Sequence, residues 1–221
     1  TRVITYAQAI NEALSQALTA DTRVLLIGQG VTSPWYVGAT TTGLVDRFGD
    51  ARVMDTPVSE SGVTGAAVGA ALAGLRPVVV HPRMDFMYYA MDAIVNQAAN
   101  WHYMFGGNFC VPLVLWGIVN RGGEQAAQHS QSIHAMFAHV PGLKVVMPST
   151  PYDAKGLLSA AIADENPVVF VDDRWLYDIS GEVPEESYVV PIGSAVVRRP
   201  GNDCTIVSSS WSSVMAIEAA K

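Results

Sequence analysis

The sequence predicts an α/β fold built on a doubly wound, mostly parallel sheet. Two observations support this prediction: short, continuous apolar runs recur along the chain, and segments of helical periodicity lie between them. Continuous apolar runs are typical of parallel strands that are buried on both faces. Strands that alternate with helices favour a sheet with helices on its two sides.

The expected elements follow in order from the N-terminus. Thr5 and Gln8 have the spacing of a capping box, and a segment with apolar residues at helical spacing follows them. Six apolar runs predict strands at residues 24–27, 52–54, 77–80, 112–115, 143–147 and 167–171. Further helices are expected at residues 41–48, 59–73, 85–105, 130–138 and 151–163. Because ligands bind beyond the carboxyl ends of such strands, function is expected in the loops after Met54, His81 and Trp116.

The pattern changes beyond residue 172. We expect residues 1–172 to form the first domain, and residues 173–191 to form a linker, because they are rich in charge and proline and lack clear periodicity. Residues 192–221 begin a second α/β unit, with a strand at residues 204–207 and a helix at residues 213–221. One strand and one helix cannot bury a core, so this second domain is expected to be truncated.

Composition argues against several classes of protein. Only 15% of the 221 residues are charged and the net charge is -7, so no basic surface is available for nucleic acid. The longest apolar stretch, residues 66–75, is much shorter than the ~20 residues of a membrane-spanning helix. Cys110 and Cys204 fit neither a disulfide framework nor a zinc site, and no leader is visible, so a reducing, cytoplasmic location is expected. The low charge content also predicts an oligomer.

The segment most informative about chemistry is residues 55–62, Asp-Thr-Pro-Val-Ser-Glu-Ser-Gly. Ser59 can cap the following helix, and Glu60 then lies in the first turn, where the helix dipole favours a carboxylate. An acid at such a position is usually a surface residue, so the local pattern does not establish catalysis. The same helix carries small residues at four-residue spacing, namely Gly65, Gly69 and Ala73. This spacing indicates a closely packed neighbour, which is either a helix of the same chain or a partner subunit.

Several further motifs occur in a fixed order along nearly the whole chain. With residues 55–62 they are Ala73-Gly74-Leu75-Arg76-Pro77, residues 92–99, Gly106-Gly107, Gln128-His129-Ser130-Gln131, residues 141–146 and residues 148–158. In these motifs the sequence resembles the beta subunit of the first components of the pyruvate, branched-chain 2-oxo acid and acetoin dehydrogenases. The resemblance implies a transketolase-like pyrimidine-binding fold and thiamine diphosphate as cofactor. It also implies decarboxylation of a small 2-oxo acid and transfer of the acyl group to a lipoylated acyltransferase.

The resemblance implies roles for individual residues. Glu60 matches the glutamate that bonds a ring nitrogen of the aminopyrimidine and so promotes removal of the thiazolium proton. Phe86 matches the aromatic residue that stacks on the aminopyrimidine, and Val58 is expected to contact the cofactor as well. His129 matches a histidine of the substrate channel, which orients the substrate carboxylate or serves in acyl transfer. Without the resemblance, Phe86 would be assigned to a helix core and His129 to the surface.

Metal ions and partners enter by the same resemblance. Relatives hold the diphosphate through Mg²⁺ with a Gly-Asp-Gly element, whereas this chain has Gly49-Asp50-Ala51. The missing element implies an alpha-type partner subunit, an α2β2 assembly and an active site between unlike chains. Relatives can also carry a monovalent cation such as K⁺ near the segment that matches residues 161–166, where Asp164 offers a carboxylate. In a eukaryote the resemblance implies the mitochondrial matrix.

The sequence departs from the family's pattern at the expected rim of the active site. Gln29-Gly30 replaces an acidic pair, residues 116–121 differ from the usual loop before the histidine, and His81-Pro82-Arg83 is unusual. These departures leave the 2-oxo acid and the transfer to a lipoyl carrier open. One alternative is a carboligase or non-oxidative decarboxylase subunit with the same cofactor. Another is a non-catalytic scaffold subunit of the same fold.

Overall fold

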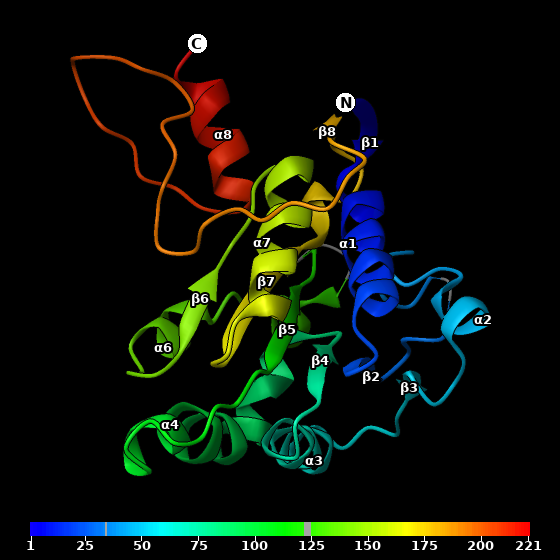
Figure 1. Ribbon diagram of the computed structural model, residues 1–221. Helices are drawn as coiled ribbons and strands as arrows, with labels where there is room; N and C mark the ends of the chain where they lie inside the picture. The colour runs from blue at the N-terminus through cyan, green and yellow to red at the C-terminus, as the bar shows by residue number, and fades with distance from the viewer. Residues whose placement is uncertain (34, 122–124) are drawn as a thin grey trace.

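The computed structural model describes residues 1–33, 35–121 and 125–221, and its centre is a six-stranded sheet (Figure 1). The strands lie in the order β3-β2-β4-β5-β7-β6, and every neighbouring pair is parallel. Their bounds are Val24–Gly28 (β2), Val53–Asp55 (β3), Arg76–His81 (β4), Val114–Val119 (β5), Lys144–Val146 (β6) and Val168–Asp173 (β7). The six predicted strands are therefore confirmed, with ends that differ by a few residues.

Helices cover both faces of the sheet, which confirms the predicted α/β class. Helices α1 and α7 pack side by side on one face, whereas α3 and α4 lie on the other (Figure 1). Alternate residues of β4 enter the two cores: Val78 and Val80 pack with α1 and α7, and Val79 packs with α3. The helices are α1 (Tyr6–Ala20), α2 (Leu44–Phe48), α3 (Glu60–Leu72), α4 (Ala99–Met104), α6 (His134–Ala138), α7 (Pro151–Ala163) and α8 (Trp211–Ala219).

Side-chain caps fix the starts of the two helices that pack together. Thr5 Oγ1 accepts a hydrogen bond from the Gln8 amide at 3.2 Å, and Gln8 Oε1 accepts one from the Thr5 amide at 2.9 Å. The predicted capping box is thus confirmed. At the start of α7, Thr150 Oγ1 accepts from the Asp153 amide, and Pro151 occupies the first helical position, where its missing N–H has no cost.

The single helix that the sequence predicted for residues 85–105 is wrong. The chain instead forms a 3-10 helix η1 (Met84–Ala90), a π-helical segment η2 (Asp92–Ala98) and then α4. Close packing beneath η1 provides a reason, because a Cβ atom on Gly117 would lie only 2.7 Å from Met87 Sδ and 3.1 Å from Met84 Cγ. The tighter turns of η1 place both methionines against β5.

The stretch expected to be a linker contains regular structure. After a 3-10 helix η4 (Arg174–Leu176), strand β8 (Ser180–Val183) pairs antiparallel with β1 (Arg2–Thr5) at the opposite end of the chain. The side chain of Lys155 holds the next residues, because its buried Nζ donates to the carbonyls of Pro184, Glu185 and Glu186 and to Glu12 Oε1. The stretch therefore folds back onto the first domain. The domain boundaries themselves stay a prediction.

The strand predicted at residues 204–207 is wrong. Residues 192–210 contain no helix or strand, and Ile206 and Val207 are 56% and 91% exposed. An apolar run forms a strand only where a neighbouring strand completes its hydrogen bonds, and this run has no such neighbour in the described structure. The helix expected nearby is present as α8, whose Trp211 stacks on Trp175 with 5.6 Å between centroids. Among the described residues, no helix is both long and apolar enough to cross a membrane.

Candidate active site

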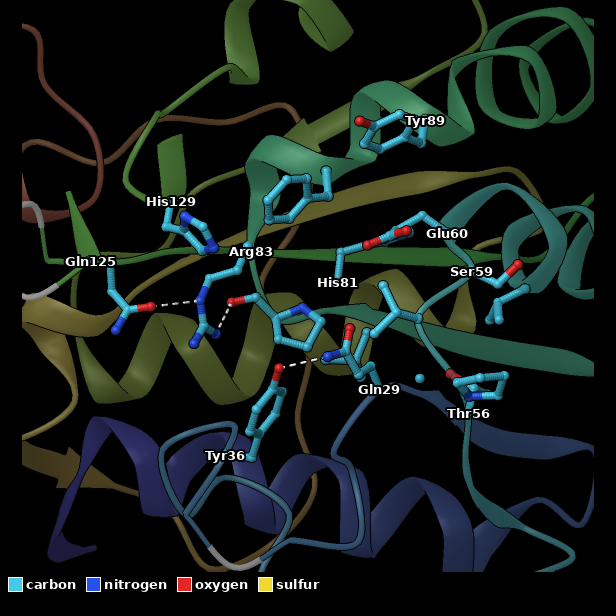
Figure 2. Close-up of a pocket in the computed structure, with 17 residues that line it drawn as sticks. Gln29, Tyr36, Thr56, Ser59, Glu60, His81, Arg83, Tyr89, Gln125 and His129 are labelled. Atoms are coloured by element: carbon cyan, nitrogen blue, oxygen red, sulfur yellow. Dashed lines mark hydrogen bonds between the residues drawn. The ribbon is translucent and has the colours of Figure 1, made fainter. Parts of the chain in front are cut away.

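A cavity of about 360 Å³ opens beyond the carboxyl ends of β2, β3 and β4. Its walls come from the loops that follow these strands and from the loop after β5 (Figure 2). Four of the predicted site residues line it together: Val58, Glu60, Phe86 and His129. The fold thus gathers side chains that are far apart in the sequence at the edge where ligands of parallel sheets bind.

Glu60 is the first residue of α3 and, among the described residues that line the cavity, the only carboxylate. Figure 2 shows it reaching from the helix start into the cavity. Within the described part of the chain, no side chain or amide bonds its carboxyl group. Ser59 occupies the predicted cap position but makes no capping hydrogen bond, so that prediction is wrong. The Glu60 carboxyl is therefore available to a ligand.

Asp55 fixes the turn that leads to Glu60. Its Oδ1 accepts hydrogen bonds from the amides of Gly30 at 2.7 Å and Thr56 at 2.9 Å, and its Oδ2 accepts one from Thr32 Oγ1 at 2.8 Å. These bonds connect the loop after β2 with the loop after β3. Because a carboxylate accepting several bonds restricts both loops, Asp55 positions the entrance to α3.

An aromatic group forms one wall of the cavity. Phe86 stacks on Tyr89 with 6.3 Å between centroids, and His129 meets Phe86 edge to face at 5.1 Å. Tyr89 is 70% exposed, and Phe86 is only partly buried. Phe86 therefore belongs to the cavity wall rather than to a helix core. A flat, partly exposed ring of this kind offers a stacking surface to an aromatic ligand.

A buried acid holds the loop of His129 against this wall. Asp85 Oδ1 accepts from the backbone amide of Gln131 at 3.0 Å and from Gln131 Nε2 at 2.9 Å. Asp85 is next to Phe86 in η1, and Gln131 is two residues from His129. The hydrogen bonds between Gln131 and Asp85 thus hold His129 and Phe86 next to each other.

His81 lies at the end of β4 and is almost completely buried beneath the cavity. Its Nε2 lies 3.3 Å from Thr64 Oγ1. Burial lowers the pKa of His81 to about 4, so the ring is neutral at physiological pH. The sequence marked this segment as unusual but assigned it no role; a polar residue at the end of an apolar strand was the available signal.

The other end of the cavity is polar. Gln29 Nε2 donates to Tyr36 Oη at 2.6 Å, and Arg83 Nε donates to Gln125 Oε1 at 3.0 Å (Figure 2). The Arg83 guanidinium also lies over the Tyr36 ring, 5.4 Å from its centroid. Sequence reasoning missed Tyr36 and Gln125, because neither belongs to a motif and Arg83, which both contact, lies far from them in the chain.

Asp164 lies outside the cavity, at the C-cap of α7. Its carboxylate accepts from Lys144 Nζ at 2.8 and 2.6 Å, while Arg76 Nη1 donates to the carbonyls of Ile162 and Asp164 at 3.0 and 3.1 Å. Protein cations thus use oxygen atoms that K⁺ would need, and this donor set does not fit a cation. Over residues 1–33, 35–121 and 125–221, no group of three or more His, Cys, Asp or Glu side chains could hold a metal ion. The K⁺ site stays a prediction without geometric support.

The small-residue face of α3 has no neighbour in the described chain. A Cβ atom built on Gly65 or Gly69 meets nothing within 4 Å, and both residues are exposed. The small residues at four-residue spacing therefore do not pack against another helix of the described chain, and that prediction is wrong. Contact with a partner subunit stays a prediction.

Comparison with known proteins agrees with this geometry. A family profile described as "Transketolase, pyrimidine binding domain" matches residues 2–179. Among solved structures, a split-gene transketolase described as an inactive beta4 tetramer aligns with a TM-score of 0.77, covering 98% of this chain and 66% of that chain. Its sequence identity is 19%, so this alignment speaks for the fold alone. The fold and cavity thus define a transketolase-type pyrimidine-binding domain.

Curated relatives narrow the class. The beta subunit of acetoin:2,6-dichlorophenolindophenol oxidoreductase from Bacillus subtilis (strain 168) is 45% identical over 99% of this chain and 68% of its own length. The 2-oxoisovalerate dehydrogenase subunit beta of the same organism is 43% identical over 99% of this chain and 67% of its own length. The pyruvate dehydrogenase E1 component subunit beta of Rhizobium meliloti (strain 1021) is 44% identical, and the match spans 98% of this chain and 47% of that protein.

The chain belongs to the family of beta subunits of thiamine-diphosphate-dependent 2-oxo acid and acetoin dehydrogenase first components. The resemblance seen in the sequence motifs is therefore confirmed. The family's enzymes are oxidoreductases, and the matched region spans about two thirds of the two Bacillus relatives.

Proposed function

We propose that this chain supplies the pyrimidine side of an active site that decarboxylates a 2-oxo acid and passes the acyl group to a lipoyl carrier. The observation that carries the proposal is the convergence of Glu60, Phe86 and His129 on one cavity. A scaffold subunit of the same fold would need none of these side chains together. A volume of about 360 Å³ also lies within the range of small-molecule and cofactor sites.

The chemistry of the lining residues fits the aminopyrimidine half of thiamine diphosphate. Phe86 provides a face for stacking, and Val58, 69% exposed, provides apolar contact close to Glu60. The Glu60 carboxyl, which no described residue bonds, can hold a proton at a ring nitrogen. When bound, the cofactor would supply a nucleophilic carbon and would accept the electron pair that stays on the substrate when carbon dioxide leaves.

His129 serves the substrate rather than the cofactor in this proposal. Its edge-to-face contact with Phe86 holds the imidazole at the end of the aromatic wall, within the cavity lining. From there it can donate a hydrogen bond to the substrate carboxylate. It can also move a proton during acyl transfer.

The remaining parts of the enzyme are proposed to come from other chains. An alpha-type subunit would hold the diphosphate and Mg²⁺, since Gly49-Asp50-Ala51 departs from the Gly-Asp-Gly element. The subunit designation of the relatives supports such a partner. We propose an α2β2 assembly that works with a lipoylated acyltransferase. The expected location is the cytoplasm, or the mitochondrial matrix in a eukaryote, as in the relative from Caenorhabditis elegans that is named mitochondrial.

Purification of the full-length protein with its natural partners tests the proposal. The complex should contain an alpha-type subunit, thiamine diphosphate and Mg²⁺, and it should release carbon dioxide from a 2-oxo acid while acylating a free lipoylated domain. Carbon dioxide release without lipoyl acylation would favour the carboligase or simple decarboxylase. Recovery of the protein alone, without cofactor under gentle conditions, would favour the scaffold subunit.

A further inference from the structure

The position of one guanidinium group is not explained by the cofactor. Arg83 follows β4 and lies at the cavity end away from Glu60, near Gln125 and His129 (Figure 2). Its Nε donates to Gln125 Oε1 at 3.0 Å, and its Nη1 donates to the carbonyl of Pro82 at 2.8 Å. The ring of Tyr36 supports its face. The guanidinium is thus held in one orientation by neutral groups.

The positive charge of Arg83 has no negative partner in the described structure. No carboxylate of the described residues lies within the 4.0 Å of an ion pair with it. Asp85, two residues further, uses Oδ1 for both bonds to Gln131. Desolvation and the nearby Arg174 lower the pKa of Arg83, and the opposing effects of Tyr36, Tyr177 and Asp85 are smaller, so its charge is only partly compensated. A partly buried cation without a counter-charge is costly unless an anion binds to it.

The carbonyl beneath Arg83 is itself fixed. Besides the Arg83 guanidinium, the Pro82 carbonyl accepts from Nδ2 of the buried Asn120 at 3.0 Å. Asn120 directly follows β5, so the loop after β4 is tied to the next strand of the sheet. Because the Arg83 side chain is already held in one orientation, it loses little further conformational entropy when a ligand binds to its N–H groups.

We propose that Arg83 binds a carboxylate of the substrate and thereby makes the enzyme select an anionic 2-oxo acid over an uncharged ketol such as acetoin. This inference rests on the proposed function and names the residue that determines its substrate class. Carboxylates are the natural partners of a directed guanidinium, which bonds them through paired N–H groups. His129 lies at the same end of the cavity and provides a second donor. The carboxylate concerned is either the one shared by all 2-oxo acids or a second one on the side chain.

Kinetics of the full-length complex test the inference with Arg83→Gln and Arg83→Lys. The substrates are pyruvate, 2-oxoisovalerate, 2-oxoglutarate and acetoin. Arg83→Gln should lower kcat/KM for the preferred acids by about tenfold to a hundredfold, mainly through KM, because hydrogen bonds to charged groups contribute about 1.5–3 kcal/mol. Arg83→Lys should recover part of this loss, and turnover of acetoin should not fall. A loss for every acid identifies the shared carboxylate, and a loss for 2-oxoglutarate alone identifies the second one.

A binding measurement separates the role of Arg83 from turnover. In a complex that carries Glu60→Ala, equilibrium dialysis with labelled acid should show weaker binding when Arg83→Gln is added. Arg199→Gln, at an exposed position outside the cavity, is the matched control and should change neither binding nor kinetics. If Arg83→Gln does not assemble, Gln125→Ala is the substitute. It leaves the charge of Arg83 in place but removes the hydrogen bond that orients the guanidinium, so it should still raise KM for the acids.

Two results would overturn the inference. One is an equal loss for acetoin and for the acids, which would make Arg83 a structural residue of the loop. The other is unchanged KM and unchanged binding of every acid. Both leave the proposed function intact, since the unmodified complex would still decarboxylate 2-oxo acids. A different result would reject the proposed function alone. In that case the unmodified complex would not decarboxylate any 2-oxo acid, but Arg83→Gln would still weaken binding of the acid in dialysis, so Arg83 would remain an anion-binding residue.

Discussion

The imidazole of His129 meets the ring of Phe86 edge to face, with 5.1 Å between the two centroids. The two hydrogen bonds that Gln131 donates to Asp85 Oδ1 connect the residues next to this contact. The residue proposed to stack on the cofactor and the residue proposed to serve the substrate are therefore parts of one packed unit. The effects of substitutions at Phe86 and His129 are therefore expected to be non-additive.

Asp85→Ala should disturb His129 without touching the cavity. It removes the acceptor of both Gln131 bonds, so we expect a loss of stability of about 1–3 kcal/mol, together with a higher KM for the substrate. Urea unfolding and steady-state kinetics of the complex measure the two effects. Asp85→Asn retains a carbonyl acceptor and should recover most of the KM. Equal KM values for Asp85→Ala and the unmodified enzyme would show that the loop holds its position without these bonds.

Glu60→Gln should reduce decarboxylation by about a hundredfold to ten-thousandfold, the range that a positioned acid or base contributes. Assembly should be unaffected, because no described residue bonds the Glu60 carboxyl. Carbon dioxide release and size-exclusion chromatography measure the two properties. Glu182→Gln, at an exposed position in β8, is the control and should be fully active. Near-normal turnover of Glu60→Gln would remove the proposed mechanism.

Phe86→Ala should weaken binding of thiamine diphosphate by about tenfold, because an aromatic stacking contact contributes about 0.5–1.5 kcal/mol beyond the buried area. Phe86→Tyr keeps the ring and should bind the cofactor almost normally. Cofactor titration of the complex, with circular dichroism as a test of folding, distinguishes the two roles of the residue. If Phe86→Ala unfolded the subunit, the ring would be a core residue after all. Phe109→Ala, outside the cavity and 45% exposed, is the matched control.

His81 should make the subunit lose stability in acid. Its pKa is about 4 in the folded protein, against the ordinary value of 6.5, so below about pH 6.5 the unfolded chain takes up a proton that the folded protein refuses. The loss grows as the pH falls and is complete near pH 4, where it reaches on the order of 3 kcal/mol. Thermal unfolding of the complex from neutral pH downward should therefore show a steeper fall than in His81→Gln.

Asp172 changes the free energy of unfolding with pH in the opposite direction to His81. For this reason the effect of His81 has to be measured by comparing His81→Gln with the unmodified chain. Burial raises the pKa of this carboxyl to about 7, from its ordinary 3.8, so the folded protein keeps a proton that the unfolded chain releases. Its contribution lowers stability as the pH rises between these two values. The difference between His81→Gln and the unmodified chain cancels the Asp172 term. A difference that does not change between about pH 7 and pH 4 would show that His81 is already accessible to protons in the folded state.

The fold was largely predictable because its strands are buried on both faces. Continuous apolar runs such as Val24–Gly28 occur where a strand has helices on both sides, and the six runs of this kind became the sheet. The strand predicted at residues 204–207 had a similar apolar run but no neighbouring strand. The pairing of β1 with β8 was missed for the complementary reason, since it joins the two ends of the domain and leaves no local pattern.

The candidate site was predictable only in part. Glu60 stood out by its place in the first helical turn, but the assignment of Phe86 and His129 needed the family resemblance, because each has an ordinary local explanation. Arg83 was noticed as a departure, and its role depends on Gln125 and Tyr36, which only the folded chain brings to it. Contacts between loops of different strands carry no sequence periodicity and become visible in the structure alone.

The buried amine of Lys155 makes the segment after β8 observable in solution. Its Nζ is enclosed by the carbonyls of residues 184–186 and by Glu12, and the side chain has no exposed surface. An acylating reagent can reach this nitrogen only during moments when the segment lifts away from α7. The rate at which Lys155 is acylated, compared with that of the exposed Lys221, therefore measures how often residues 184–186 open.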